Sequence, residues 1–448
     1  MLKSLFRAVQ LPDLRNRIVF TLGMLLVFRL IAHIPVPNIN PTALQSLQDA
    51  LANNQLAQLL NLFAGGALQQ LSVASMGVYP YITAQIIVQL LTPLIPALET
   101  LSREGEQGRQ RINRITFWLT VPLAYLQAFG QTRTLEVATN GVSLFRTPFD
   151  LVTNFLPTLT ILTTMVAGTM LLIWLGEQIQ ERGIGNGISM IIFAGIVSRL
   201  PSVIYQAIST AQVGAEQIIG IVAFIVIALL TIVGIVLVQE GQRRIQVQYV
   251  KRVRGNRVYG GQSSHIPLKV NMAGMIPLIF AQSIIIFPGT IASYGCPTGT
   301  ADAGAGIMTQ IACGVFRTFS PQYAGGTVVY TVLLFLLVVG FTYFYTMVIF
   351  QQQNIPDSLQ RNGGFIPGIR PGKKTEEYLA RVVYRITLVG ALFLGIVAIL
   401  PYITQHLTGV QIGLGATSLL IVVGVAIDTM RQLEAQLVMR NYEGFISK

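Results

Sequence analysis

Long apolar runs recur along this chain of 448 residues, and each is close to the length that crosses a lipid bilayer. A helix needs about 20 apolar residues to span roughly 30 Å of hydrocarbon. Hydrophobic residues make up 52% of the sequence and charged residues only 11%. This composition predicts an all-α polytopic membrane protein with ten transmembrane helices. The predicted spans are residues 18–36, 75–95, 114–131, 153–175, 187–205, 217–238, 271–292, 327–350, 382–403 and 412–430.

The distribution of Lys and Arg predicts the orientation, because basic residues near span ends are retained on the cytoplasmic side. With the N-terminus placed inside, Arg133, Arg146, Arg199 and Arg317 fall outside, Arg29 falls within a span, and the rest of the 30 basic residues are cytoplasmic. Both termini are therefore expected in the cytoplasm. The same asymmetry accounts for most of the net charge of +12, so this charge does not by itself indicate a nucleic-acid-binding protein.

The connections predict two pseudo-symmetric halves of opposite topology, residues 1–205 and 206–448, with five spans each. In the first half the long connection, residues 37–74, follows the first span on the outside. In the second half the long connection, residues 239–270, follows the sixth span in the cytoplasm. A second basic cytoplasmic connection, residues 351–381, follows the eighth span. Inversion of one half relative to the other predicts this exchange of sides.

The segment NLFAGGALQQLSVASMGVYPYI, residues 61–82, ends the external connection. Its first part is too short to cross a bilayer and too apolar for an ordinary loop. It either folds back into the protein as a half-helix, which requires surrounding protein or a water-filled cavity, or lies flat on the outer surface.

Motifs for catalysis or cofactor binding are not found in the sequence. The three histidines, His33, His265 and His406, are too scattered for a metal site. GIRPGKKT, residues 368–375, has three residues between its glycines, where a phosphate-binding loop has four and follows a strand. We therefore expect a protein that is not an enzyme and that uses no cofactor and no metal.

The two cysteines, Cys296 and Cys313, fall in the external connection between the seventh and eighth spans. They either form a disulfide or remain two free thiols.

A permease for a small solute is the alternative function. Coupled transporters carry ionisable groups near the membrane midplane. The predicted spans contain almost none, apart from Arg29 within reach of the outer face and Asp428 near the cytoplasmic end of the tenth span. They are instead rich in isoleucine, glycine and small polar residues, which suits a passage for chemically varied contents.

Eight strings in chain order carry a more specific signal: FRLIAHIPVPNI, YPYITAQIIVQLLTPLIP, REGEQGRQRI, ERGIGNGISMIIFAGIVSRLP, RRIQVQYVKR, IPLKVNMAGMIPLIFAQSIIIFP, GGFIPGIRPGKKT and GATSLLIVVGVAIDTM. Over essentially its whole length the chain resembles the SecY/Sec61-alpha family, the pore-forming subunits of the Sec protein translocon. The resemblance implies a protein-conducting channel that passes unfolded polypeptides and releases apolar segments sideways into lipid.

The resemblance also implies the partners and the location. Expected partners are SecE-like and SecG-like membrane subunits, the SecA motor ATPase, the ribosome including its RNA, signal sequences, unfolded preproteins and membrane lipid. The expected location is a bacterial plasma membrane or a thylakoid membrane.

Two site elements follow from matching the family by position. A plug helix at about residues 62–73 corresponds to Leu62, Phe63, Ala64, Gly65, Gly66, Ala67, Leu68 and Leu71, whose small residues permit a close but removable fit. A mid-membrane ring corresponds to Ile82, Ile86, Ile188, Ile192, Ile279 and Ile421. Branched apolar groups around a narrow neck exclude water and ions by dewetting. Taken one at a time, such isoleucines more often pack a core or face lipid.

The resemblance also implies a lateral gate, at which spans two and three separate from spans seven and eight. The gate residues expected on spans two and seven are Thr83, Gln85, Gln89, Gln282, Ser283 and Phe287. Small polar groups can close such a seam through hydrogen bonds of about 1 kcal/mol or less, and the alternative is ordinary interhelical packing. Partner docking corresponds to Arg243, Arg244, Lys251, Arg252, Arg254, Arg361, Arg370, Lys373 and Lys374. Topology alone accounts for part of this charge, but Arg370 lies in PGIRPG, where prolines and glycines restrict the chain and the family has a position important for transport.

Overall fold

The computed structural model describes residues 10–41, 43–53, 61, 64–139, 143–150, 153–211, 215–249, 252–254, 257–259, 263–295, 306–319, 324–408 and 416–446. The elements up to residue 211 are α2 (Pro12–Ile31), α3 (Ala43–Asn53), η1 (Ala67–Gln70), α5 (Tyr79–Leu91), α6 (Pro96–Arg103), α7 (Glu106–Ala138), α8 (Phe155–Arg182) and α9 (Gly187–Ala211). The later elements are α10 (Ala215–Glu240), β1 (Gln242–Tyr249), β2 (Arg252–Arg254), β3 (Arg257–Tyr259), β4 (Ser263–Lys269), α11 (Ile276–Gly295), α12 (Ile307–Phe319), α13 (Ala324–Gln353), α14 (Ile355–Arg361), β5 (Gly364–Phe365), α15 (Lys373–Thr408) and α16 (Ala416–Ile446).

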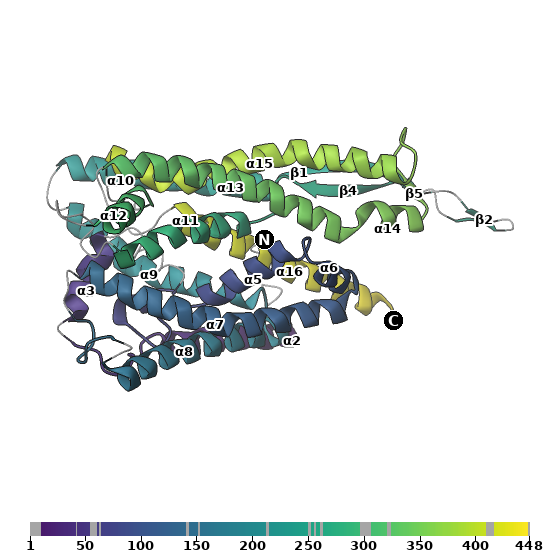
Figure 1. Cartoon of the computed structure of the whole chain (residues 1–448). Helices are drawn as coiled ribbons and strands as arrows, with labels where there is room; N and C mark the ends of the chain where they lie inside the picture. The colour runs from purple at the N-terminus through teal and green to yellow at the C-terminus, as the bar shows by residue number, and fades with distance from the viewer. Residues whose placement is uncertain are drawn as a thin grey trace.

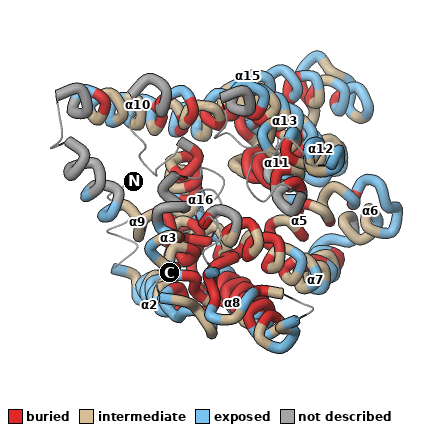
Figure 2. Tube along the Cα trace, turned by 60° about the vertical axis from the view of Figure 1, so that its left-hand side comes forward, coloured by how far each residue is buried: buried red, intermediate tan, exposed pale blue. Residues whose placement is uncertain are grey.

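The long helices form two outer groups with a set of inner helices between them (Figures 1 and 2). Helices α2, α7 and α8 make one outer group, and α10, α13 and α15 make the other. Helices α5, α9, α11 and α16 lie between them, with α9 against α16 and α5 against α11. Buried residues are frequent on the inner helices and on α8 (Figure 2). The main hydrophobic cluster includes residues of α5, α8, α9, α11 and α16.

Among the described residues, fewer helices are long and apolar enough to cross a membrane than the ten spans that the sequence predicts. Four stretches are long and apolar enough to cross a membrane, Phe155–Arg182, Ile219–Glu240, Val328–Arg361 and Lys373–Thr404, and the pair α5–α6, bent by 104°, brings the number to five at most. Two inner helices, α9 and α11, contain only shorter apolar segments. Helices enclosed by protein or facing a water-filled cavity need not be apolar throughout, so composition alone does not establish ten spans.

A small β-sheet departs from the all-α prediction. Strands β1 and β4 pair antiparallel, from Gln242 opposite Lys269 to Gln248 opposite Ser263, and β5 pairs with the other edge of β1. The run RRIQVQY alternates apolar and polar residues, which is the strand period, and Ile245 and Val247 are buried. The sheet lies at one end of the molecule, termed here the sheet end, and α3 and α12 lie at the opposite end (Figure 1).

Candidate functional site

A cavity of about 650 Å³, named here the central cavity, is lined by the inner helices α5, α9, α11 and α16 and by the end of β4, a strand at the sheet end. Both parts of the chain line it, since Glu106 comes from the start of α7 and Lys269 from the end of β4. Much of its lining is polar: Gln85, Gln110, Asn113, Gln180, Asn186, Ser189, Gln239 and Asn271. Ligand-binding cavities have volumes in this range, so this cavity is the candidate functional site.

Isoleucines from three inner helices line the same cavity: Ile82 of α5, Ile188 and Ile192 of α9, and Ile279 of α11. These are four of the six predicted ring positions. Ile86 and Ile421 belong to the same hydrophobic cluster but do not line the cavity. Ile421 is 0% exposed and packs in the core. The six predicted isoleucines thus belong to one hydrophobic cluster, but only four of them line the cavity.

Along helix α9, the first residues line the cavity, the isoleucines follow, and the next residues contact the segment before α5. Asn186 and Ser189 at its start line the cavity, Ile192 follows, and Gly195 then meets the residues just before η1. At 1.5 Å of rise per residue, Gly195 lies about 4.5 Å beyond Ile192 along the helix. The isoleucines therefore lie between the cavity and this segment.

Residues 64–73 fold inward as the half-length segment that the sequence suggests. The described part is a four-residue 3₁₀ helix, η1, preceded by Gly65 and Gly66, which both have positive φ. Ala64, Ala67, Leu68 and Leu71 are buried in the main core. Of the predicted plug residues, Leu62 and Phe63 lie outside the described residues. The regular helix is shorter than predicted because two adjacent left-handed glycines and the left-handed Leu71 interrupt it.

The packing around Gly65 is too close for a side chain. A Cβ placed on Gly65 would lie 2.8 Å from Cζ of Phe28 and 3.3 Å from Cα of Gly195. At Gly66 the neighbour is the Arg199 side chain, whose Cδ would lie 3.3 Å from such a Cβ. The glycines thus allow the backbone of this segment to fill the space beside α2 and α9. None of these contacts on α2 and α9 was predicted from the sequence.

The other end of this segment is held by backbone hydrogen bonds. The Val36 N–H donates to the Leu71 carbonyl at 2.9 Å, and the Val73 N–H donates to the Ile34 carbonyl at 2.9 Å. These bonds anchor the segment from Ala64 to Leu71 beside the end of α2. This segment is called the plug below. Gln70, at the end of η1, is exposed.

The seam between α5 and α11 carries the polar side chains predicted for a lateral gate. Tyr79 of α5 lies near Ser283 of α11, although the Ser283 hydroxyl has no well-aligned hydrogen bond among the described residues. Gln89 of α5 interacts with Tyr345 of α13. Thr83 bonds within the first half instead, because Gln127 Nε2 of α7 donates to its hydroxyl at 3.2 Å.

Two of the predicted gate glutamines occupy different positions. Gln85 lines the cavity, whereas Gln282 is 2% exposed and its Oε1 has no hydrogen-bond partner among the described residues. Leaving a buried acceptor unpaired costs about 1–3 kcal/mol, so this oxygen of Gln282 does not stabilise the packing around it. The Phe287 side chain lies outside the described part of the structure.

The two basic connections predicted to dock partners form one unit. Gln248 and Tyr249 of β1 pair with Phe365 and Gly364 of β5. A separate hydrophobic cluster beneath the sheet joins β1, β4, α14 and α15. The predicted docking residues with described side chains are all exposed: Arg243, Arg244, Arg361, Arg370, Lys373 and Lys374. Lys251 and the side chains of Arg252 and Arg254 lie outside the described residues.

Arg370 lies in a turn that its neighbours hold in place. Gly368 and Gly372 have φ values of 82° and 101°, conformations that favour glycine. The buried Thr375 hydroxyl donates to the Arg370 carbonyl at 2.9 Å. The arginine is thus presented to solvent from a restrained backbone.

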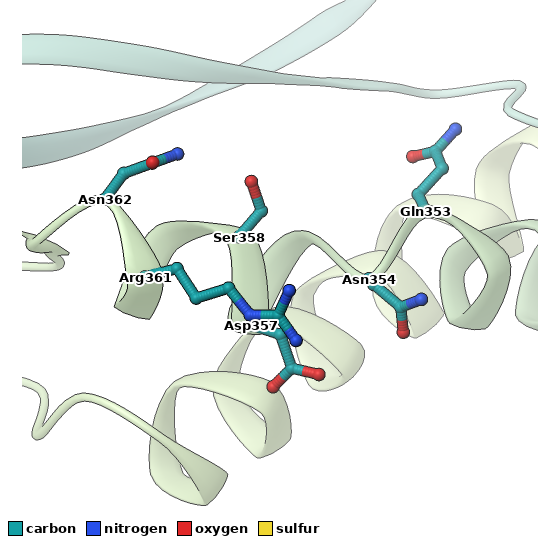
Figure 3. Close-up of a pocket in the computed structure, with 6 residues that line it drawn as sticks. All are labelled: Gln353, Asn354, Asp357, Ser358, Arg361 and Asn362. Carbon is teal, nitrogen blue, oxygen red and sulfur yellow. The ribbon is translucent and has the colours of Figure 1, made fainter. Parts of the chain in front are cut away.

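A second cavity, of about 460 Å³, lies beside this unit at the break between α13 and α14 (Figure 3). Its lining consists of Gln353, Asn354, Asp357, Ser358, Arg361 and Asn362. Asn354 adopts a left-handed conformation at the break. Asp357 and Arg361 lie on one side of α14 and Ser358 points to the other (Figure 3).

Cys313 on α12 is buried and disulfide-bonded. The only other cysteine in the sequence, Cys296, lies outside the described residues. Helix α12 contacts both α11 and α13, so this cross-link belongs to the connection beside the seam.

Comparison with known proteins identifies the family. The SecY family model matches residues 72–430. A protein translocase subunit SecY of Thermotoga maritima is 43% identical over 456 residues, covering 100% of this chain and 98% of that protein. The corresponding subunit of Bacillus subtilis is 42% identical over 454 residues, covering 100% of both.

Solved structures share the fold. A protein conducting channel aligns with a TM-score of 0.63 at 17% identity, covering 95% of this chain and 93% of that one. Sec61 in the canine ribosome-channel complex aligns with a TM-score of 0.62 at 17% identity, with the same coverage. From the family match and the full-length identity to its relatives, the chain belongs to the SecY family.

Proposed function

We propose that this chain is the pore-forming subunit of a protein-conducting channel, which passes unfolded polypeptides across a membrane and releases apolar segments sideways into lipid. The proposal rests mainly on the order of residues along α9. Cavity-lining Ser189 comes first, Ile192 follows, and Gly195, which packs against the plug, comes next. Membership in the SecY family supports the same function. A small-solute permease is not favoured, because the full-length relatives are protein translocase subunits.

The proposed topology has ten spans, in two inverted halves covering residues 1–205 and 206–448, with both termini in the cytoplasm. The sheet end is the cytoplasmic end, because exposed Arg243, Arg244, Arg361 and Lys373 gather there and basic residues are retained inside. The plug then lies on the external side of the isoleucines.

In the resting channel the isoleucines exclude water from the neck and the plug fills the space beyond it. The six isoleucines are proposed as the ring, with Ile82, Ile188, Ile192 and Ile279 facing the cavity. A passing polypeptide displaces the plug, which is built from small residues and from left-handed glycines. The chain itself needs no catalytic group for these steps.

Sideways release requires the α5–α11 seam to separate. A signal-sequence helix can replace its few polar interactions at little energetic cost, because each contributes about 1 kcal/mol or less. Energy for passage comes from a partner that binds the sheet-end unit, with Arg370 as its main contact. Guanidinium binds carboxylates and phosphates in a bidentate manner, which suits a motor protein or ribosomal RNA.

The proposed partners are SecE-like and SecG-like membrane subunits, the SecA motor ATPase and the ribosome. A likeness in fold to Sec61 in a ribosome-channel complex supports the ribosome. The proposed location is a bacterial plasma membrane.

Reconstitution tests the function directly. Proteoliposomes that contain the chain and its small membrane subunits are expected to import an unfolded preprotein only when motor ATPase and ATP are supplied. Uptake of small solutes without any partner, together with no preprotein import, would instead establish a permease.

A further inference from the structure

Two adjacent residues of α16 contact separate parts of the chain. Nη2 of Arg431 lies 2.8 Å from Glu240 Oε1 and donates to the Gln239 carbonyl at 3.2 Å. The next residue, Gln432, accepts a hydrogen bond at 2.9 Å from the Gly185 N–H, in the turn between α8 and α9. Successive residues of a helix point about 100° apart, so one helix can hold two partners on different sides. Helix α16 therefore joins the end of α10 to the start of α9.

The end of α10 is joined closely to the sheet-end unit. Gln239 and Glu240 are its last two residues, and only Gly241 separates them from β1. A Cβ placed on Gly241 would lie 2.9 Å from the Leu237 carbonyl oxygen and 3.1 Å from Cγ2 of Val270. The Gly241 carbonyl also accepts a hydrogen bond from the Val270 N–H, at the end of β4, at 2.9 Å. This joint leaves little freedom, so a displacement of the sheet reaches Glu240.

The turn between α8 and α9 is held from two sides. The Ile184 N–H donates to the Thr21 hydroxyl of α2 at 3.1 Å, and Ile184 packs in a small hydrophobic cluster with Leu433 of α16. Gly185 has a φ of 88°, and a Cβ placed on it would lie 3.2 Å from Oγ1 of Thr429 on α16. The position of this turn thus depends on α16 as well as on α2.

The same turn begins the helix that lines the central cavity. Asn186 Oδ1 accepts a hydrogen bond from the Ser189 N–H at 3.1 Å, and the Asn186 carbonyl accepts one from the Met190 N–H at 2.9 Å. These capping bonds fix the first turn of α9 to the α8–α9 turn. Ile188 lies in this first turn and lines the cavity, and Ile192 follows one turn later. A shift of the α8–α9 turn therefore shifts two isoleucines of the proposed ring.

A contribution to folding does not explain the pair of Arg431 and Glu240 well. The two side chains are 31% and 41% exposed, and exposed ion pairs contribute little to stability. Their separation in the sequence is 191 residues. Three other ion pairs of the described residues instead join near neighbours: Arg111 with Glu104, Arg133 with Glu136, and Lys374 with Glu377. A weak bond between distant elements positions them relative to each other and can break and re-form without unfolding the chain.

We propose that Arg431 and Gln432 are positioning residues, which transmit a displacement of the sheet-end unit through α16 to the α8–α9 turn and so to the isoleucines of α9. A partner that binds the sheet-end unit thereby widens the neck without touching it. Energetic coupling between separate sites can pass through a continuous series of contacts, and Glu240, Arg431, Gln432 and Gly185 form one. The inference rests on the proposed channel function.

The first test exchanges the charges of the ion pair. Arg431→Glu is expected to lower preprotein import about two- to fivefold, the effect of losing one partly exposed ion pair, while the affinity for the motor ATPase stays unchanged. The double variant Arg431→Glu/Glu240→Arg is expected to regain most of that import, because the pair re-forms with its charges reversed. Arg381→Glu, at an exposed site on α15, is the control for charge reversal.

The second test changes the other contact. Gln432→Leu removes the acceptor of the Gly185 N–H and is expected to lower import to a similar degree, whereas Gln432→Glu keeps an acceptor and is expected to import normally. Spin labels at two exposed residues, Arg182 beside the turn and Arg114 on α7, measure movement of the turn. Binding of the motor is expected to change their separation in the unmodified chain and in Gln432→Glu, but not in Arg431→Glu or Gln432→Leu.

Two results would overturn the inference. One is unchanged import in Arg431→Glu or Gln432→Leu, and the other is a loss of import that matches a loss of motor affinity. Failure of the unmodified chain to import any preprotein would overturn the channel function instead, so the two failures are distinguishable.

Discussion

Gly65 of the plug and Gly195 of α9 pack backbone against backbone: a Cβ placed on Gly195 would lie 2.2 Å from Cα of Gly65. Gly195 follows Ile192, which lines the central cavity, by three residues along α9. The fit of the plug is thus decided by the absence of two side chains. Because the backbones already touch, α9 and the plug cannot both stay in place if either glycine gains a methyl group.

Gly195→Ala is expected to displace the plug and raise the ion conductance of the resting channel. Alanine in a helix interior normally gains about 0.5–1 kcal/mol over glycine, but forcing a methyl group into a filled site costs about 1–3 kcal/mol, so the clash prevails. Planar-bilayer recordings measure the leak. Gly23→Ala on α2 is the matched control, because a Cβ there meets nothing within 4 Å. An unchanged seal in the Gly195 variant would mean that the plug does not close the channel.

Ile279→Asn is expected to let ions pass through the resting neck without reducing preprotein import. An amide on the cavity side of the isoleucines holds water where branched apolar groups exclude it. Ile279→Val keeps the apolar surface and should cost only about 0.5–1.5 kcal/mol of stability while the seal persists. Conductance and import are to be recorded on the same reconstituted samples. Equal conductance of the Asn and Val variants would remove Ile279 from the proposed ring.

Arg370→Glu is expected to abolish motor-driven import while folding and the ion seal stay intact. The side chain is exposed on a turn restrained by Gly368, Gly372 and Thr375, so its loss removes a contact and not a packing interaction. Arg370→Lys should restore only part of the activity, because an ammonium cannot replace a bidentate guanidinium. Arg381→Glu, an exposed site on α15, controls for charge reversal. Import at the unmodified rate by the Arg370→Glu variant would refute the docking role.

Thr375→Val is expected to weaken import without changing any exposed charge. It removes the hydroxyl that donates to the Arg370 carbonyl, a bond worth about 1 kcal/mol, while keeping the volume of a buried side chain. Faster hydrogen exchange confined to residues 366–375, with lower motor affinity, would show that the loss acts through the turn. Unaltered motor affinity would assign Thr375 to folding alone.

The double variant Tyr79→Cys/Ser283→Cys is expected to lock the seam when the two thiols are joined by a bifunctional reagent with a reducible linker, because the Tyr79 side chain spans from α5 to Ser283 of α11. Insertion of an apolar segment into lipid should then stop and recover on reduction. Each single variant serves as a control. If complete crosslinking leaves insertion unimpeded, apolar segments leave by another route.

Cys313→Ser is expected to leave conduction intact, since α12 lies beside the seam and contributes no residue to the central cavity. Peptide mapping should find the Cys313 peptide blocked to alkylation until a reductant is added, in agreement with its bonded state. A Cys313 thiol that reacts in the native, unreduced protein would contradict that bond.

Much of the candidate site was accessible from the sequence because it consists of apolar runs and recognisable strings. Hydropathy and the Lys/Arg distribution predicted a helical membrane protein, and the resemblance carried over the isoleucines and the plug. The run RRIQVQY was the clearest missed signal: its alternation indicates a strand, and the strand joins the two basic connections. Ile86 and Ile421 were expected in the ring but do not line the cavity. The sequence pattern around an isoleucine in a span is the same whether the side chain lines a cavity or packs in the core.

The sequence by itself determined the class of protein. Each polar side chain placed in lipid raises the free energy, so membrane-spanning segments appear in the sequence as apolar runs of characteristic length. Only the tertiary structure decided which surfaces meet. The contact of Gly65 with Gly195 and the shared presence of Ile82, Ile192 and Ile279 in the lining of one cavity depend on how separate helices pack. The identity of a single residue does not indicate which distant residue it will contact. Such contacts depend on how the assembled helices pack and not on local preferences of the chain.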